Sequence, residues 1–118
     1  MTRPIGPYSP VVEAGGWIIC SGQLGLVEGE LVAGAAAQTT QALKNAEALL
    51  VSRDAHLTDV VKTLVFLTDM GDFEEMNDAY AAVFGDHRPA RSAVGVSALP
   101  KAARVEIELW AHRSIGIS

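Results

Sequence analysis

The chain has 118 residues, enough for one domain with a hydrophobic core and too few for two. Hydrophobic residues make up 49% of it and charged residues 19%, which is typical of a globular protein. The net charge is −5 and the basic residues do not cluster, which argues against a nucleic-acid partner. The single cysteine, Cys20, excludes a disulfide within the chain, and no apolar run approaches the ~20 residues of a membrane-spanning helix.

The first half of the chain predicts two β-hairpins and a helix. Two strand-like runs within residues 11–23 flank Gly15 and Gly16, which suit a tight turn. A weaker hairpin within residues 24–34 centres on residues 28–30. Residues 35–53 are helix formers, and the apolar side chains that recur at helical spacing are Ala42, Leu43, Ala46, Leu49 and Leu50.

The second half predicts a strand, a second helix and two closing strands. Residues 60–69 are rich in β-branched and aromatic residues, which favour a strand. Asp72 suits the N-cap of a helix over residues 72–84, and Glu75 completes a pattern like a capping box. In residues 89–108, two short strands with alternating apolar residues flank a proline turn.

This order of elements predicts an α+β fold in which two helices cover one face of a mixed sheet. The apolar residues of the last two strands, Val94 and Ile107 among them, should face the helices, which leaves Arg91, Glu106 and Trp110 on the open face. A tryptophan among charges on an open sheet indicates that another subunit covers it. The alternative is a lone exposed tryptophan beside solvated charges.

The residues that most often bind metals or act as nucleophiles are isolated in this sequence. His56, His87 and His112 have no partner at ligand spacing, so we interpret them as surface residues. Cys20 lies in an apolar run and is expected to be a small core residue. No glycine pattern leads into the lysine and hydroxyl residue of a phosphate-binding loop. The sequence therefore predicts neither a metal nor a cofactor.

Arg91 and Glu106 are the remaining candidates for chemistry. A guanidinium is planar and always charged, and it can donate two parallel hydrogen bonds to a carboxylate ligand. A carboxylate nearby can hold or activate a water molecule. The alternative is a structural pair between Arg91 and Glu106 across two neighbouring strands.

Four stretches in chain order resemble the RidA/YjgF family of imine deaminases: IGPYSP at 5–10, CSGQ at 20–23, VVKTLVFLTDMGDFEEMNDAY at 60–80 and PARSAVGVSALPKAARVEIE at 89–108. The last stretch is the most specific, and together they span nearly the whole chain. The resemblance implies one domain over residues 1–118 with a chorismate-mutase-like fold. It also implies a homotrimer with a central barrel and ligand sites at the subunit interfaces.

The resemblance further implies an activity. Proteins of this kind hydrolyse 2-imino acids such as 2-iminobutanoate and 2-iminopropanoate, or their enamine tautomers, to 2-oxo acids and ammonia without a cofactor. By position in the motifs, Arg91 matches the arginine that grips the substrate carboxylate, and Glu106 matches the glutamate that positions the attacking water.

Four more residues match positions near the ligand in the family: Tyr8, Ser21, Asn77 and Ala93. Tyr8 is alternatively a packed aromatic residue, Ser21 a strand-end hydroxyl bonded to backbone, and Asn77 a structural helix amide. Ala93 stands where many active deaminases have a cysteine whose backbone lies near the ligand. The substitution and the short loop over residues 84–91 both change the pocket relative to the family.

Two other functions compete with the deaminase. One is a trimer that binds a small carboxylate such as a 2-oxo acid without catalysis, and the retained Glu106 argues against it. The other is RNA cleavage, which the negative charge disfavours. The first ten residues lack the apolar stretch of a signal peptide, so we expect a cytoplasmic protein with a small-molecule substrate and no membrane or nucleic-acid partner.

Overall fold

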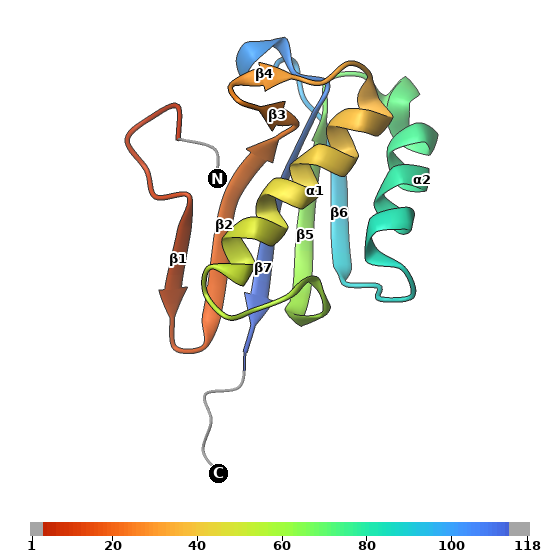
Figure 1. Cartoon of the computed structure of the whole chain (residues 1–118). Coiled ribbons are helices and arrows are strands. Elements are labelled where there is room, and N and C mark those ends of the chain that lie inside the picture. The colour runs from red at the N-terminus through yellow and green to blue at the C-terminus, as the bar shows by residue number, and fades with distance from the viewer. Residues whose placement is uncertain (1–3, 114–118) are drawn as a thin grey trace.

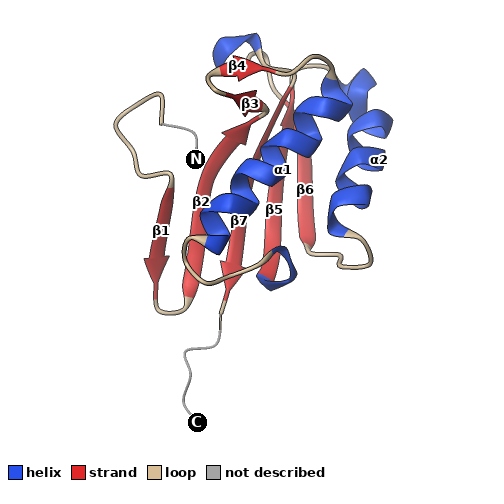
Figure 2. Cartoon of the chain, in the orientation of Figure 1, coloured by secondary structure: helices blue, strands red, loops and turns tan. Residues whose placement is uncertain are grey.

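A five-stranded mixed sheet with both helices on one face forms the frame of the computed structural model, which describes residues 4–113 (Figures 1 and 2). The strands lie in the order β1-β2-β7-β5-β6, and β5 and β6 are parallel. The predicted α+β class is confirmed. The strands are β1 (Val11–Ala14), β2 (Trp17–Leu24), β3 (Leu26–Val27), β4 (Glu30–Leu31), β5 (Val60–Leu67), β6 (Ala90–Gly95) and β7 (Val105–His112), the helices are α1 (Ala35–Val51) and α2 (Phe73–Phe84), and short 3-10 turns span Leu57–Asp59, Met70–Asp72 and Pro100–Ala102.

Both predicted hairpins are present, and each turns on residues with positive φ. Gly15 and Gly16 have φ of 55° and 87° between β1 and β2. Glu28 and Gly29 have φ of 51° and 82° between β3 and β4, which form a separate two-stranded sheet. Two positive φ angles in a two-residue turn match the right-handed twist of the strands that the turn joins.

Strand β5 lies between β6 and β7, so the two closing strands are not neighbours. β5 pairs with β6 in parallel and with β7 in antiparallel orientation, and α2 forms the crossover from β5 to β6. A structural pair of Arg91 and Glu106 across two neighbouring strands is therefore ruled out within this chain.

The prediction for the two faces of β7 is confirmed. Ile107 and Leu109 are fully buried against the helices, while Glu106 is half-buried and Trp110 is 37% exposed on the opposite face. The open face carries further apolar side chains, of which Val12, Trp17 and Val94 are exposed. Such a face is incompletely covered in a single chain.

The prediction for β6 is wrong by one residue. Arg91 lies in register with Thr63 of β5, and Thr63 lies in register with Leu109, so all three share the helix-covered face. Ala93 packs beside the core, and Val94 is 43% exposed on the open face. The parallel pairing with β5 sets this register, which the alternation of small and apolar residues in β6 did not reveal.

The helix bounds are close to the prediction, but the capping box is wrong. The carboxylate of Asp72 accepts hydrogen bonds from Nε and Nη2 of Arg104 at 3.0 and 2.8 Å instead of capping α2. Oε2 of Glu75 accepts a hydrogen bond from the backbone N–H of Ala36 at 3.1 Å. This carboxylate thus caps α1, whose own N-cap residue, Gly34, has no side chain to do so.

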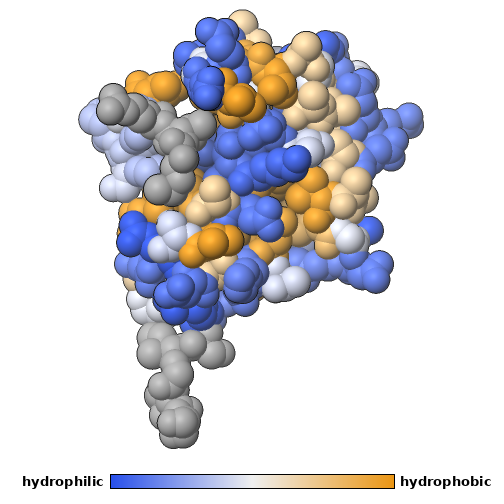
Figure 3. Space-filling view, in the orientation of Figure 1, coloured by the Kyte–Doolittle hydropathy of each residue, from blue (hydrophilic) through white to orange (hydrophobic). Residues whose placement is uncertain are grey.

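The outer surface of the helix layer is mixed in hydropathy (Figure 3). Seen from the helix side, hydrophilic and hydrophobic residues are mixed over its outer surface (Figure 3). Neither α1 nor α2 is long and apolar enough to cross a membrane, and no other helix within residues 4–113 is either.

Replacing Glu75 by alanine should destabilise the fold, because the first turn of α1 then loses both its acceptor and a favourable negative charge. We expect the free energy of unfolding in urea to fall by about 0.5–2 kcal/mol, the usual cost of losing a helix cap. Glu74→Ala is the matched control, since Glu74 is an exposed carboxylate in the same turn of α2 without a helix to cap. Equal losses in both variants would contradict the capping role.

Candidate active site

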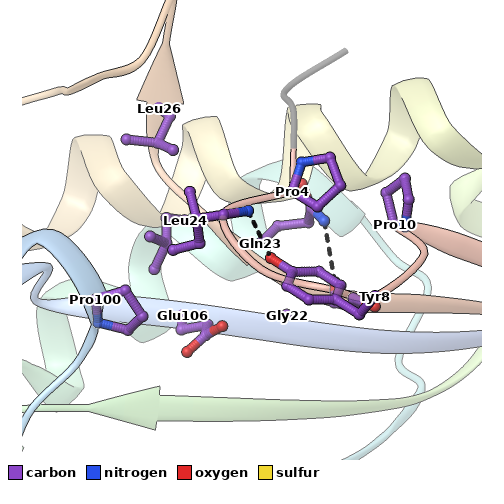
Figure 4. Close-up of a pocket in the computed structure, with 11 residues that line it drawn as sticks. Pro4, Tyr8, Pro10, Gly22, Gln23, Leu24, Leu26, Pro100 and Glu106 are labelled. Carbon is purple, nitrogen blue, oxygen red and sulfur yellow. Dashed lines mark hydrogen bonds between the residues drawn. The ribbon is translucent and has the colours of Figure 1, made fainter.

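A cavity of about 320 Å³ lies between the N-terminal segment, β2 and β7 (Figure 4). Its walls are mainly prolines and aliphatic residues, and its polar groups come from a tyrosine, a serine, a glutamine and a glutamate. The residues that line it are Pro4, Ile5, Tyr8, Pro10, Ser21, Gly22, Gln23, Leu24, Leu26, Pro100 and Glu106. A few polar groups in an apolar hollow are typical of a small-molecule site.

The carboxylate of Glu106 reaches this cavity because Gly22 lacks a side chain. A Cβ atom at Gly22 would lie 2.8 Å from Cδ of Glu106, closer than real Cβ contacts allow. The pairing of β2 with β7 shifts register between Cys20 and Gln23, which places Gly22 beside the carboxylate. Glu106 forms no hydrogen bond with the residues that the structure describes, so its oxygens remain open to a ligand or water.

The electrostatics of Glu106 favour proton exchange. Burial raises the pKa of its carboxyl group above the ordinary value, and the like charge of Glu108 on the same strand face raises it further. A carboxyl group with a raised pKa, placed in a cavity, is a candidate for general acid–base chemistry.

Tyr8 and Ser21 line the same cavity. Tyr8 is 45% exposed, so it is not the packed aromatic residue of the alternative interpretation, and its hydroxyl accepts a 3.4 Å hydrogen bond from the N–H of Ile5. The hydroxyl of Ser21 donates to the carbonyl of Ser9 at 2.7 Å, and its N–H donates to the carbonyl of Pro10. Ser21 therefore links the N-terminal segment to β2 by two hydrogen bonds. Its hydroxyl oxygen can still accept a hydrogen bond from another donor.

Arg91 lies apart from this cavity, on the edge strand β6 and on the other face of the sheet. Its guanidinium carbon is 4.9 Å from the ring centroid of Tyr80 and 5.7 Å from that of Phe73, both in α2. Nη1 is 3.9 Å from the sulfur of Met76. Among residues 4–113 no carboxylate forms an ion pair with Arg91.

Asn77 and Ala93 do not line the Glu106 cavity, and they lie on α2 and β6, the two elements that hold Arg91 and its ring contacts. Asn77 belongs to α2, and its Oδ1 atom is buried without a hydrogen-bond partner among the described residues. Ala93 follows Arg91 on the same face of β6. The predicted site residues thus fall into two groups: Tyr8, Ser21 and Glu106 at the cavity, and Asn77, Arg91 and Ala93 between β6 and α2.

Sequence reasoning missed several residues that shape the cavity. Pro10, Gly22 and Pro100 come from three separate segments, and only the three-dimensional pairing of β2 with β7 shows that they converge. Gly22 stands within the CSGQ motif, so that motif contained the signal, although the reason for a glycine there was visible only in the structure.

The histidines, which we interpreted as surface residues, are exposed at positions 56 and 112, whereas His87 is half-buried. Nε2 of His87 is hydrogen-bonded to the carbonyl of Val60, and His112 packs on the ring of Trp17. Burial raises the pKa of the Cys20 thiol to about 12, which confirms it as a core residue. Across residues 4–113, no three acidic, histidine or cysteine side chains are grouped to hold a metal ion.

The raised pKa of Glu106 predicts how the stability depends on pH. A carboxyl group with a raised folded-state pKa stabilises the fold while it is protonated, and this contribution is lost as the pH rises through the raised pKa. Glu106→Gln is neutral at every pH. The variant should therefore be more stable than the wild type in urea unfolding at pH 7, and the difference should vanish below about pH 4, near the unfolded pKa.

The second cause of the shift supplies a control. In a Glu108→Gln background the like charge is gone, so the pH-dependent gain from Glu106→Gln should be smaller. A stability gain of Glu106→Gln that does not change with pH would show that the shape of the side chain, and not its charge, distinguishes the variant from the wild type.

Comparison with known proteins places the chain in a family. Residues 1–113 match the family model described as endoribonuclease L-PSP. A RutC family protein from Pyrococcus horikoshii is 45% identical over 114 residues, which cover 94% of this chain and 90% of the relative. The 2-iminobutanoate/2-iminopropanoate deaminase of Escherichia coli K12 is 43% identical, and the match covers 92% of this chain and 89% of that protein. The deaminase of the same name from Homo sapiens is 45% identical, and the match covers 88% of this chain and 78% of that protein.

Solved structures agree with the fold. A crystal structure of a putative endoribonuclease from Thermotoga maritima has a TM-score of 0.90 at 43% identity, covering 95% of this chain and 91% of that one. The structure of E. coli TdcF with bound serine has a TM-score of 0.90 at 37% identity, covering 94% and 91%.

Proposed function

This chain belongs to the endoribonuclease L-PSP family, the RidA/YjgF proteins, and we propose that it hydrolyses 2-imino acids and their enamine tautomers to 2-oxo acids and ammonia. The observation that carries the proposal is Glu106, a partly buried carboxylate that has a raised pKa, forms no hydrogen bond within residues 4–113 and faces an apolar cavity. The deaminases among the relatives support the choice of reaction, with 2-iminobutanoate and 2-iminopropanoate as the first substrates to test.

For this reaction the protein has to position the substrate and a water molecule and to transfer protons between them. Water adds to the carbon of the protonated C=N bond, so a C–O bond forms and the nitrogen receives the π electrons. Glu106 accepts a proton from the attacking water and returns it to the nitrogen of the carbinolamine that forms. The C–N bond then breaks as the hydroxyl oxygen forms the C=O bond and gives its proton to Glu106, which releases ammonia and the 2-oxo acid. A raised pKa suits this exchange, since the group gains and loses its proton closer to neutral pH.

The substrate carboxylate needs a second group, and Arg91 is the candidate. Its guanidinium has no carboxylate partner among the described residues, so it is free to bind one bidentately. Ala93 lies two residues after Arg91 on the edge strand β6, where its backbone can add a contact to a ligand. Asn77 contributes a buried acceptor that has no partner within residues 4–113, which suits the N–H group of an imine or enamine.

The two groups of residues are separated within one chain, so the complete site requires two copies. Arg91 lies on the edge strand β6, from which it can extend to the Glu106 cavity of a neighbouring copy. The exposed apolar residues on the open face favour burial against other copies. We therefore include the homotrimer with interface sites in the proposal, acting in the cytoplasm without a metal or cofactor.

A binding role without turnover is the second candidate. TdcF of E. coli has been solved with bound serine, a small carboxylate. In that case Arg91 would be required to bind the ligand, and replacing Glu106 would leave the affinity for the ligand unchanged. RNA cleavage, which the family description names, has less support because the chain has a net charge of −5.

The test is to generate 2-iminobutanoate in solution and follow the release of 2-oxobutanoate and ammonia with and without the protein. The wild type should accelerate release. Glu106→Gln should reduce the rate by roughly a hundredfold, because glutamine cannot take up a proton. Arg91→Lys should reduce it at least about tenfold, since an ammonium cannot form the two parallel hydrogen bonds.

Glu108→Gln is the matched control, since Glu108 shares the strand face of Glu106 but does not line the cavity. It should keep turnover within about twofold of the wild type. Binding of 2-oxobutanoate without any acceleration of release would identify the protein as a carboxylate-binding module. Release of RNA fragments that depends on Arg91 would instead support the nuclease.

A further inference from the structure

Arg91 contacts uncharged groups of α2 and forms no ion pair with the acidic residues that the structure describes. Its guanidinium carbon lies over the rings of Tyr80 and Phe73, at 4.9 and 5.7 Å from their centroids, with the sulfur of Met76 near Nη1. The acidic residues of α2 lie on the exposed side of the helix instead, and these are Glu74, Glu75 and Asp78. The helix therefore presents a neutral, aromatic face to the arginine.

This arrangement has a consequence for ligand binding. An aromatic ring attracts a guanidinium through its quadrupole and fixes its plane, but it leaves the positive charge and the N–H donors of the outer edge unused. A carboxylate partner would do the opposite, since it would occupy the donors and compete with an anionic ligand. A ring thus orients Arg91 without neutralising it.

The ring of Tyr80 is itself fixed to the sheet. Its hydroxyl lies 2.6 Å from Oγ1 of Thr63, and both groups are buried. Thr63 is the residue of β5 in register with Arg91 of β6. The hydrogen bond therefore ties the ring to the strand position next to the arginine that it supports.

We propose that Phe73 and Tyr80 are positioning residues, which orient the guanidinium of Arg91 for a ligand carboxylate, and that Thr63 fixes Tyr80 in this role. The proposal rests on the function proposed above, because it takes the carboxylate of a 2-imino or 2-oxo acid as the ligand. Phe73 and Tyr80 do not touch that ligand and act through Arg91.

The first measurement follows Arg91 in the protein without ligand. Its Nε–Hε group gives a signal in 1H–15N spectra that Arg91→Lys removes, which assigns it. In the wild type we expect a signal displaced by ring currents and restricted in its motion. Phe73→Leu keeps an apolar side chain but loses the ring, so the signal should shift towards that of a free arginine and become more mobile.

The second measurement is the affinity for 2-oxobutanoate in the same variants, by titration. Phe73→Leu should raise the Kd by roughly tenfold, and Phe73→Tyr, which restores a ring, should recover both the signal and the affinity. Phe84→Leu is the matched control, because Phe84 is an aromatic residue of the same helix that packs on Tyr80 but does not contact Arg91. It should lower the melting temperature without moving the Arg91 signal or the Kd.

The outcomes separate this inference from the proposed function. An unchanged Arg91 signal or an unchanged Kd in Phe73→Leu, with a wild type that binds 2-oxobutanoate, overturns the positioning role alone. Equal loss of affinity in Phe73→Leu and Phe84→Leu also overturns it, since the effect would then be one of packing. A wild type that neither binds 2-oxobutanoate nor accelerates imine hydrolysis overturns the proposed function, and the positioning role with it.

Discussion

Strand β5 separates the two charged side chains on which the proposed chemistry depends. It pairs with β6 on one side and β7 on the other, so Arg91 and Glu106 lie two strands apart. The register then turns Arg91 towards the helices and Glu106 towards the open face. In the function proposed here, each chain contributes two half-sites, the Glu106 cavity and the Arg91 side chain packed on α2, and a 2-imino acid needs both to be bound and hydrolysed.

Both charged side chains depend on a close contact between elements of the fold. Glu106 reaches its cavity because Gly22 has no side chain at the register shift of β2. Arg91 keeps its charge available because α2 meets β6 with rings and a thioether instead of carboxylates. The acidic residues at the start of α2 are used elsewhere, where Asp72 binds Arg104 and Glu75 caps α1.

The parts of the fold that local physics determines were predictable from the sequence. Gly15 and Gly16 indicated a hairpin because few other residues adopt positive φ, and the alternation in β7 identified its two faces. The register of β6 was not predictable, since it depends on parallel pairing with the distant strand β5, where Thr63 pairs with Arg91, and because the residues of β6 are small. The capping box failed because long-range partners took both carboxylates.

The candidate site was predictable to the extent that the family resemblance names residues by position. Tyr8, Ser21 and Glu106 do converge on one cavity, although no spacing in the sequence shows it. The contributions of Pro10, Gly22 and Pro100 could not be predicted, because they depend on where the N-terminal segment and the turn before β7 cross β2. The separation of Arg91 from Glu106 likewise follows from topology alone.

The central claim is that Arg91 of one copy completes the Glu106 cavity of another, and subunit mixing tests it most directly. Arg91→Ala and Glu106→Gln chains, each inactive alone, are refolded together in equal amounts and compared with a mixture of separately folded variants. If the site is shared, a random symmetric assembly places intact partners at roughly a quarter of the sites, so co-refolding should restore about that fraction of wild-type 2-iminobutanoate hydrolysis. A co-refolded mixture as inactive as the separately folded variants, with mixed oligomers present, would contradict the account.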